Sequence, residues 1–197
     1  PCHTHRMPFT GLGLNASLLK GVKELGFVRP TPIQAESIPV ALAGHDLLAG
    51  AQTGSGKTAA FLLPTMHRLL ERPRRATRAL IITPTRELAA QILEDFNALA
   101  VHTHLTGAAV YGGVSMGPQE HAFRAHTDVI VATPGRLLDH ASQRTVDLSG
   151  IEILVLDEAD RMLDMGFIHD MKKIIALVPK QKQTLMFSAT FSDEIRG

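Results

Sequence analysis

The residues best suited to chemistry form a glycine-rich loop, Ala51-Gln-Thr-Gly-Ser-Gly-Lys-Thr58. The preceding residues 46–50 have the pattern of a short buried strand, and the following residues 58–70 carry apolar side chains at helical spacing. Glycines at 54 and 56 allow positive φ and a close approach of the backbone to an anion, where free N–H groups and a helix dipole converge. Lys57 can then reach the β- and γ-phosphates of a nucleotide, and the Thr58 hydroxyl can ligate Mg²⁺.

This loop departs from the usual phosphate-binding pattern at its first position, which is Ala51 instead of glycine. The alternative interpretation is a glycine-rich turn with a chance Lys-Thr pair. The strand before the loop and the helix after it favour phosphate binding.

A second reactive group, Asp157-Glu-Ala-Asp160, directly follows the apolar segment 151–156. In open α/β sheets ligands bind beyond the carboxyl ends of the strands, which places these acids at the same edge as the loop. Asp157 can hold the Mg²⁺ that bridges the β- and γ-phosphates, and Glu158 can orient or deprotonate an attacking water. Acids at a helix N-terminus are also common for electrostatic reasons alone, but the phosphate loop in the same chain favours the catalytic interpretation.

The rest of the chain alternates apolar and amphipathic segments that would position these groups. Strands are expected at 46–50, 79–83, 105–111, 128–133, 151–156 and 183–188, and helices at 14–25, 33–42, 58–70, 86–100 and 170–177. A helix-compatible polar stretch runs from the glycines at 112 and 113 to His126. Continuous apolar strands are typical of a sheet covered on both faces. We therefore expect one α/β domain with a mostly parallel central sheet and helices on both faces.

Composition narrows the class of protein. The 197 residues are 45% hydrophobic, which supports a substantial core, but no uninterrupted apolar run reaches the ~20 residues of a membrane span. The formal charge of +1 does not indicate a general polyanion binder. A single cysteine, Cys2, excludes an internal disulfide and fits a reducing, cytoplasmic setting. Residues 1–8 lack periodicity and are expected to be a leader segment or a cloning remnant. The arginine-rich segment 71–78 is expected to be a solvated connector.

Asp157-Glu-Ala-Asp160 resembles the signature of the DEAD-box RNA helicases, in particular bacterial members, and other motifs of that family follow in order over residues 9–195. Phe9 with the segment Gly26–Gln34 resembles the adenine-recognition motif. Ala51–Thr58 resembles the family's phosphate loop, which begins with alanine. The segments that resemble its RNA-contacting and coupling motifs are Pro84-Thr-Arg-Glu-Leu88, Gly112-Gly113, Thr133-Pro-Gly-Arg136 and Ser188-Ala-Thr190.

The resemblance implies a RecA-like P-loop NTPase fold and an ATP-dependent RNA helicase that hydrolyses ATP with Mg²⁺. It implies nucleotide contacts at Phe9, Arg29, Thr31, Gln34, Gln52, Thr53, Gly54, Ser55, Gly56, Lys57 and Thr58. It assigns catalysis to Glu158, Lys57 and Asp157, and the metal to Thr58 and Asp157. RNA contacts are implied at Pro84, Thr85, Arg86, Gly112, Gly113, Thr133, Pro134, Gly135 and Arg136, and coupling of hydrolysis to strand separation at Asp160, Ser188 and Thr190.

The chemistry of these residues supports some of the implied roles. The Gln34 amide offers one donor and one acceptor to the adenine N7 and N6 groups, whereas guanine presents two acceptors there. Gln34 could instead be a helix-surface residue. Phe9 could stack on the base or pack in the core beneath the N-terminus. Small residues and free backbone N–H groups at the RNA motifs suit a phosphate backbone and predict sequence-independent binding.

The family has two RecA-like domains, and this chain stops just after Ser188-Ala-Thr190. Residues 9–197 are therefore expected to be the N-terminal domain. Its partners would be RNA and the second RecA-like domain, with no membrane. The isolated domain is expected to be nearly inactive, because the family takes its arginine fingers from the second domain. Alternatives are an ATP-gated RNA clamp or scaffold without productive unwinding, and a DNA-directed relative.

Overall fold

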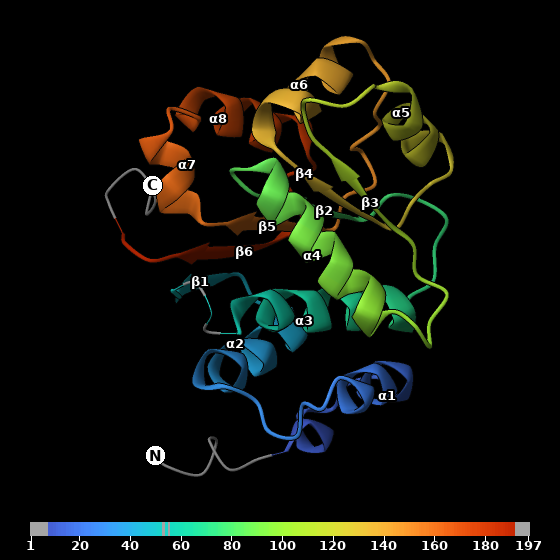
Figure 1. Cartoon of the computed structure of the whole chain (residues 1–197), viewed down its shortest axis with the longest axis vertical. Helices are drawn as coiled ribbons and strands as arrows, with labels where there is room; N and C mark the ends of the chain where they lie inside the picture. Colours follow the sequence, from blue (N-terminus) through green and yellow to red (C-terminus); the bar gives the residue numbers. More distant parts are fainter. Residues whose placement is uncertain (1–7, 53, 55, 192–197) are drawn as a thin grey trace.

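The computed structural model describes residues 8–52, 54 and 56–191. Their strands form one sheet with the order β1-β6-β5-β2-β4-β3, in which every pair of neighbours is parallel (Figure 1). The strands are β1 (Leu47–Gly50), β2 (Ala79–Ile82), β3 (Gly107–Val110), β4 (Val129–Ala132), β5 (Ile153–Asp157) and β6 (Gln183–Ser188). The predicted parallel α/β fold is confirmed.

Helices cover both faces of the sheet, as its apolar strands require. The first core is formed with α1 (Ala16–Glu24), α2 (Pro32–Leu42), α3 (Lys57–Glu71) and α4 (Arg86–Leu99). The second is formed with α5 (Gly117–Arg124), α6 (Pro134–Ser142), α7 (Ala159–Asp164) and α8 (Ile168–Leu177). Successive strand residues alternate between the two, so that Ile81 and Val155 lie in the first core, and Leu80 and Leu154 in the second.

The carboxyl edge of the sheet gathers the reactive segments. The phosphate loop follows β1 and the acids follow β5, while β6 lies between these two strands. The segments after β2, β4 and β3 come next to one another along the same edge, because those strands are neighbours. Among the described residues no helix is long and apolar enough to cross a membrane.

Most predicted elements are present, with shifted ends. The strand expected at 105–111 is confined to Gly107–Val110, and helices α6 and α7 were not predicted. The solvated-connector prediction is wrong at Arg78, which is only 2% exposed. Its guanidinium donates hydrogen bonds to the carbonyls of Leu69, at 2.9 Å, and of Arg72, and it pairs with Glu152 at 3.3 Å. Arg78 thereby satisfies carbonyls at the C-terminal end of α3 that no helical N–H can reach.

Candidate nucleotide-binding site

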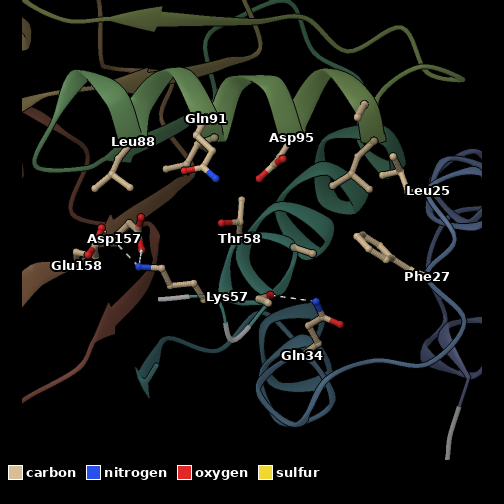
Figure 2. Close-up of a pocket in the computed structure, with 16 residues that line it drawn as sticks. Leu25, Phe27, Gln34, Lys57, Thr58, Leu88, Gln91, Asp95, Asp157 and Glu158 are labelled. Atoms are coloured by element: carbon tan, nitrogen blue, oxygen red, sulfur yellow. Dashed lines mark hydrogen bonds and ion pairs between the residues drawn. The ribbon is translucent and has the colours of Figure 1, made fainter. Parts of the chain in front are cut away.

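A cavity of ≈ 320 Å³ brings together the predicted nucleotide motifs (Figure 2). The phosphate loop contributes Gly54, Gly56, Lys57 and Thr58, and the segment after β5 contributes Asp157 and Glu158. Gln34 and Phe27 from the N-terminal motif line another part, and α4 lines the remaining wall with Leu88, Gln91 and Asp95 among others. These segments are distant in sequence and meet only because β1 and β5 end at the same edge.

The backbone of the phosphate loop explains its glycines. Gly54 and Gly56 have φ of 83° and 84°, the left-handed region that side chains rarely adopt. A Cβ on Gly56 would also lie 2.7 Å from Gln34 Nε2 and 2.7 Å from Thr31 Oγ1, whereas a Cβ on Gly54 would meet empty space. Thr53 and Ser55, which were predicted to contact the nucleotide, lie outside the described residues.

Lys57 is the hub of the phosphate end. Its Nζ lies 3.0 Å from Asp157 Oδ1 and 3.7 Å from Glu158 Oε2, so the loop lysine is paired with both acids. Burial raises the pKa of the Asp157 carboxyl, and the Lys57 ammonium opposes that rise. The Thr83 hydroxyl, at the end of β2, donates a weak hydrogen bond of 3.5 Å to Asp157 Oδ2.

The two carboxylates beside Lys57 have spare coordinating capacity. Asp157 Oδ1 and Glu158 Oε2 are buried, and among the described residues their one cationic partner is the Lys57 ammonium, at 3.0 Å and 3.7 Å. Thr58 supplies a hydroxyl in the same cavity. Mg²⁺ takes oxygen ligands and keeps several waters and substrate phosphates in its shell, so one carboxylate and one hydroxyl suffice. No three His, Cys, Asp or Glu side chains in the described part of the chain form a metal-binding group.

Glu158 has an unusual backbone for a residue with a side chain. Its φ of 54° and ψ of 52° are left-handed, and it forms the N-cap of α7. A non-glycine residue in this conformation costs on the order of 1–3 kcal/mol. His126 and Arg144 also have positive φ, of 54° and 58°, so the conformation alone does not distinguish Glu158. Its position in the cavity lining, beside Lys57, does.

Gln34 connects the N-terminal motif to the phosphate loop. Its Oε1 accepts a hydrogen bond from the Thr31 N–H at 2.9 Å, and its Nε2 donates to the Gly56 carbonyl at 3.0 Å (Figure 2). Each amide atom can still make one further hydrogen bond. Gln34 is buried at the cavity wall and is not a helix-surface residue. Among the described residues, one donor and one acceptor of its amide have no partner.

The structure does not support base stacking by Phe9. The Phe9 ring is 3% exposed, belongs to the first core and stacks against Phe27 with centroids 6.5 Å apart. Phe27 is 46% exposed and lines the cavity, so it is the aromatic ring that a base can reach. Phe27 was not among the predicted nucleotide contacts, although it directly follows Gly26 within the segment Gly26–Gln34. Arg29 and Gln52 are exposed and lie outside the cavity lining that the described residues form.

The predicted RNA motifs lie in a row after β2, β3 and β4, but their side chains differ in accessibility. Arg86 is exposed. Its Nη1 lies close to Gly113, because a Cβ added to Gly113 would be only 2.8 Å from it. Thr85 uses its hydroxyl to cap α4, accepting from the Leu88 N–H at 3.3 Å. Arg136 is turned inward and donates to the Val114 carbonyl at 2.8 Å.

The remaining predicted RNA contacts divide in the same way. Pro84 and Pro134 are buried, so their side chains are not available to RNA in this structure. Gly112, Gly113 and Gly135 are exposed, and Thr133 is half-buried. The edge therefore presents mainly backbone and small residues, with Arg86 as its exposed cation.

The model of one protein family, described as DEAD/DEAH box helicase, matches residues 31–196. The chain belongs to this family.

Relatives in the family come from distant organisms. DEAD-box ATP-dependent RNA helicase 28 of Arabidopsis thaliana is 49% identical over 98% of this chain and 25% of its own length. Probable ATP-dependent RNA helicase ddx27 of Dictyostelium discoideum is 51% identical over 95% of this chain and 24% of its own length. ATP-dependent RNA helicase CshA of Listeria monocytogenes is 47% identical over 95% of this chain and 36% of its own length. The chain thus spans about a quarter to a third of the length of these relatives. The eukaryotic and bacterial relatives have similar percentages of identity to this chain, so the particular resemblance to bacterial members stays a prediction.

The DEAD-box acids also contact the last strand, at the segment that resembles the family's coupling motif. The Thr190 hydroxyl donates to Asp160 Oδ2 at 3.3 Å. The Ser188 hydroxyl accepts from the Asp160 backbone N–H at 3.3 Å and donates to the Thr190 carbonyl. Thr190 thus contacts the Asp160 carboxylate, whereas the Ser188 hydroxyl contacts the Asp160 backbone N–H. A coupling role for these residues stays a prediction.

Proposed function

We propose that this chain is the ATP-binding motor domain of an ATP-dependent RNA helicase, which couples ATP binding and hydrolysis to RNA binding and local duplex separation. The observation that carries the proposal is Lys57, which pairs with both Asp157 and Glu158 in a cavity that extends to Gln34. One wall of that cavity thus holds a cation and acids for phosphates and metal, and another holds an amide for a base. Relatives named as ATP-dependent RNA helicases support the proposal.

Nucleotide binding would exchange the partners of Lys57. The β- and γ-phosphates would replace the two carboxylates as the anions beside Nζ, so the ammonium would remain paired. Asp157 and Thr58 would then hold Mg²⁺, and a cation there would favour the ionised form of this buried acid. Bound Mg²⁺ would supply charge neutralisation to the phosphates. Glu158, next to Asp157, would orient the attacking water and accept its proton.

Base selection would occur at the other end of the cavity. Gln34 retains one donor and one acceptor beyond its bonds to Gly56 and Thr31, which suits the N7 and N6 groups of adenine. Phe27 offers an exposed ring for stacking. Because Gln34 also holds the Gly56 carbonyl, a bound base would stabilise the phosphate loop.

RNA would lie along the edge after β2, β4 and β3, held by backbone N–H groups and Arg86 without base recognition. A second RecA-like domain of a longer, cytoplasmic protein would complete this path and supply the arginine fingers, which are worth roughly 10³–10⁵ in rate. Residues 9–197 would correspond to the N-terminal RecA-like domain. The isolated chain would therefore bind nucleotide while showing almost no RNA-stimulated hydrolysis.

Titration with a fluorescent adenine nucleotide tests the proposal on this chain. The Lys57→Ala variant should lose binding, because it removes the cation from an otherwise backbone-built cradle. Lys173→Ala, which removes an exposed lysine of α8, is the control and should bind normally. Unchanged affinity of Lys57→Ala would remove Lys57 from the nucleotide site. Equal affinities for ADP and GDP would remove Gln34 from base selection. Failure of the longer protein to separate RNA duplexes would favour the clamp alternative.

A further inference from the structure

A buried polar network lies beneath the predicted RNA edge, between α5 and α6. Its centre is formed by Gln119 of α5, which is 5% exposed, and His140 of α6, which is fully buried. Neither residue belongs to the motifs that resemble those of the family. Burying polar side chains is costly unless every donor and acceptor finds a partner, and such a network then fixes one geometry.

The network holds the Gly112-Gly113 turn on both sides. Gln119 Nε2 donates to the carbonyl of Tyr111, just before the turn, at 3.0 Å. Arg136 Nη1 donates to the carbonyl of Val114, just after it, at 2.8 Å. The two clamping side chains also contact each other, since Arg136 Nη1 lies 3.3 Å from Gln119 Oε1. One amide thus joins the turn after β3 to the segment after β4.

The same contacts determine the orientation of the Gln119 amide. Its oxygen faces the Arg136 guanidinium, and its nitrogen faces the Tyr111 carbonyl. The reversed amide would place N–H groups against a donor and oxygen against oxygen, so only one orientation satisfies all partners.

This orientation determines the protonation of His140. His140 Nε2 lies 2.8 Å from Gln119 Oε1, which only accepts, so Nε2 carries the proton. His140 Nδ1 lies 2.8 Å from Thr145 Oγ1, whose single hydrogen can be donated either to Nδ1 or to the His140 carbonyl oxygen, 3.0 Å away. When the ring is neutral, Nδ1 is an acceptor and takes this hydrogen. Burial and the Arg136 charge lower the pKa of His140, while the Glu120 and Asp139 carboxylates oppose them, so the neutral ring prevails at neutral pH. Phe123, one turn from Gln119 on α5, packs edge-on to the imidazole at 5.1 Å between centroids.

We infer that Gln119 and His140 are positioning residues for RNA binding, which hold Arg136 and the Gly112-Gly113 turn in a fixed relation. His140 fixes the Gln119 amide, and Gln119 in turn orients the turn and the guanidinium. The Arg86 guanidinium also lies close to Gly113. Displacement of the turn would therefore also affect Arg86, which belongs to the segment after β2. The inference rests on the proposed function only for its RNA readout.

A matched pair of substitutions isolates the Nε2 hydrogen bond. In His140→Gln the amide nitrogen falls near the Nε2 position and can still donate to Gln119, whereas in His140→Asn it falls near Nδ1 and faces Thr145. Both variants bury a neutral amide at the same site. Titration with single-stranded oligouridine at low ionic strength should show near-normal affinity for His140→Gln. For His140→Asn it should show a loss of about tenfold, the effect of one hydrogen bond of ordinary strength. Binding of a fluorescent adenine nucleotide should be unchanged in both.

Amide hydrogen exchange of residues 112–116 gives a readout that needs no RNA. Exchange there should accelerate in His140→Asn by about tenfold and stay near the wild-type rate in His140→Gln. Wild-type rates and RNA affinity in both variants would overturn the inference, and so would equal losses in both or a parallel loss of nucleotide affinity. If the wild-type chain itself binds no RNA, the proposed RNA contact fails, while the exchange rates still decide whether the network positions the turn.

Discussion

The Gln34 side chain donates a hydrogen bond of 3.0 Å to the carbonyl of Gly56, which joins the N-terminal motif to the phosphate loop. The two residues are packed so closely that Gly56 has no room for a Cβ. The part of the site proposed to read the base and the part proposed to hold phosphates are therefore one mechanical unit. A substitution in the loop should therefore alter base recognition by Gln34, and a substitution of Gln34 should alter phosphate binding by the loop.

Substitution of Gly56 by alanine should abolish nucleotide binding. The variant would place a methyl group 2.7 Å from Gln34 Nε2 and force alanine into a left-handed conformation that costs roughly 1–2 kcal/mol. Gly54→Ala is the matched control, because its φ is almost the same but its Cβ would meet nothing. Thermal denaturation should show a loss of stability from backbone strain in both variants and a further loss from the clash in Gly56→Ala, and nucleotide titration should also show the larger loss in Gly56→Ala. Equal binding losses would mean that strain alone matters.

Phe27 and Phe9 should separate binding from stability. Phe27→Ala removes a half-exposed ring at the cavity and should weaken adenine nucleotide binding by about 1–3 kcal/mol of stacking with little loss of stability. Phe9→Ala removes a core ring and should destabilise the fold by about 3–5 kcal/mol. Urea denaturation and nucleotide titration of both variants check this. If Phe9→Ala weakens binding while stability is unchanged, base stacking returns to Phe9.

Glu158→Gln, placed in the longer protein, should keep nucleotide binding and slow hydrolysis. The amide preserves shape but cannot accept a proton from water, and such a loss is typically 10²- to 10⁴-fold, in order of magnitude. Asp164→Asn, an exposed acid at the end of α7, is the control and should turn over normally. Single-turnover hydrolysis measures the effect. Near-normal rates for Glu158→Gln would move the proton-accepting role to another group.

Thr190→Val should uncouple the longer protein more than it inhibits hydrolysis. The variant deletes the hydroxyl that donates to the Asp160 carboxylate but keeps the shape of the side chain. Duplex separation should fall by more than ATP turnover, measured on the same preparation. Ser142→Ala removes a surface hydroxyl of α6 and should alter neither. Parallel losses in Thr190→Val would indicate a structural role.

The stability of the chain should depend on pH through His140. Its folded-state pKa is depressed from the ordinary value of 6.5 by burial and by Arg136, against the opposing Glu120 and Asp139 carboxylates. The unfolded chain therefore binds the proton more readily. The stabilisation is complete above about pH 6.5 and is lost as pH falls through the folded-state pKa. Urea unfolding of the wild type and of His140→Gln, at about pH 7.5 and about pH 5.5, should show the steeper acid loss in the wild type. An equal loss of stability between the two pH values in the wild type and in His140→Gln would mean that His140 is already protonated or accessible in the folded state.

The sequence alone was sufficient to predict the parallel sheet and the meeting of the glycine-rich loop with the acids after β5 at its carboxyl edge. Each of these depends on local patterns: glycines where φ is positive, apolar runs for strands buried on both faces, and acids at a strand end. The order of the strands did not have to be known to predict where these segments lie, because parallel strands end at one carboxyl edge whatever their order.

Tertiary structure decided which side chains face ligand and which face the core. Phe9 and Phe27 are both aromatic and close in sequence, yet packing buries the first and leaves the second at the cavity. Arg78 and Arg136 look like surface cations, but carbonyls at the end of α3 and after the Gly112-Gly113 turn hold their guanidinium groups inside. The Gln119–His140 pair has no sequence signature, because its geometry exists only when α5 and α6 pack together. Such roles depend on contacts between distant segments, which no local pattern of residues can specify.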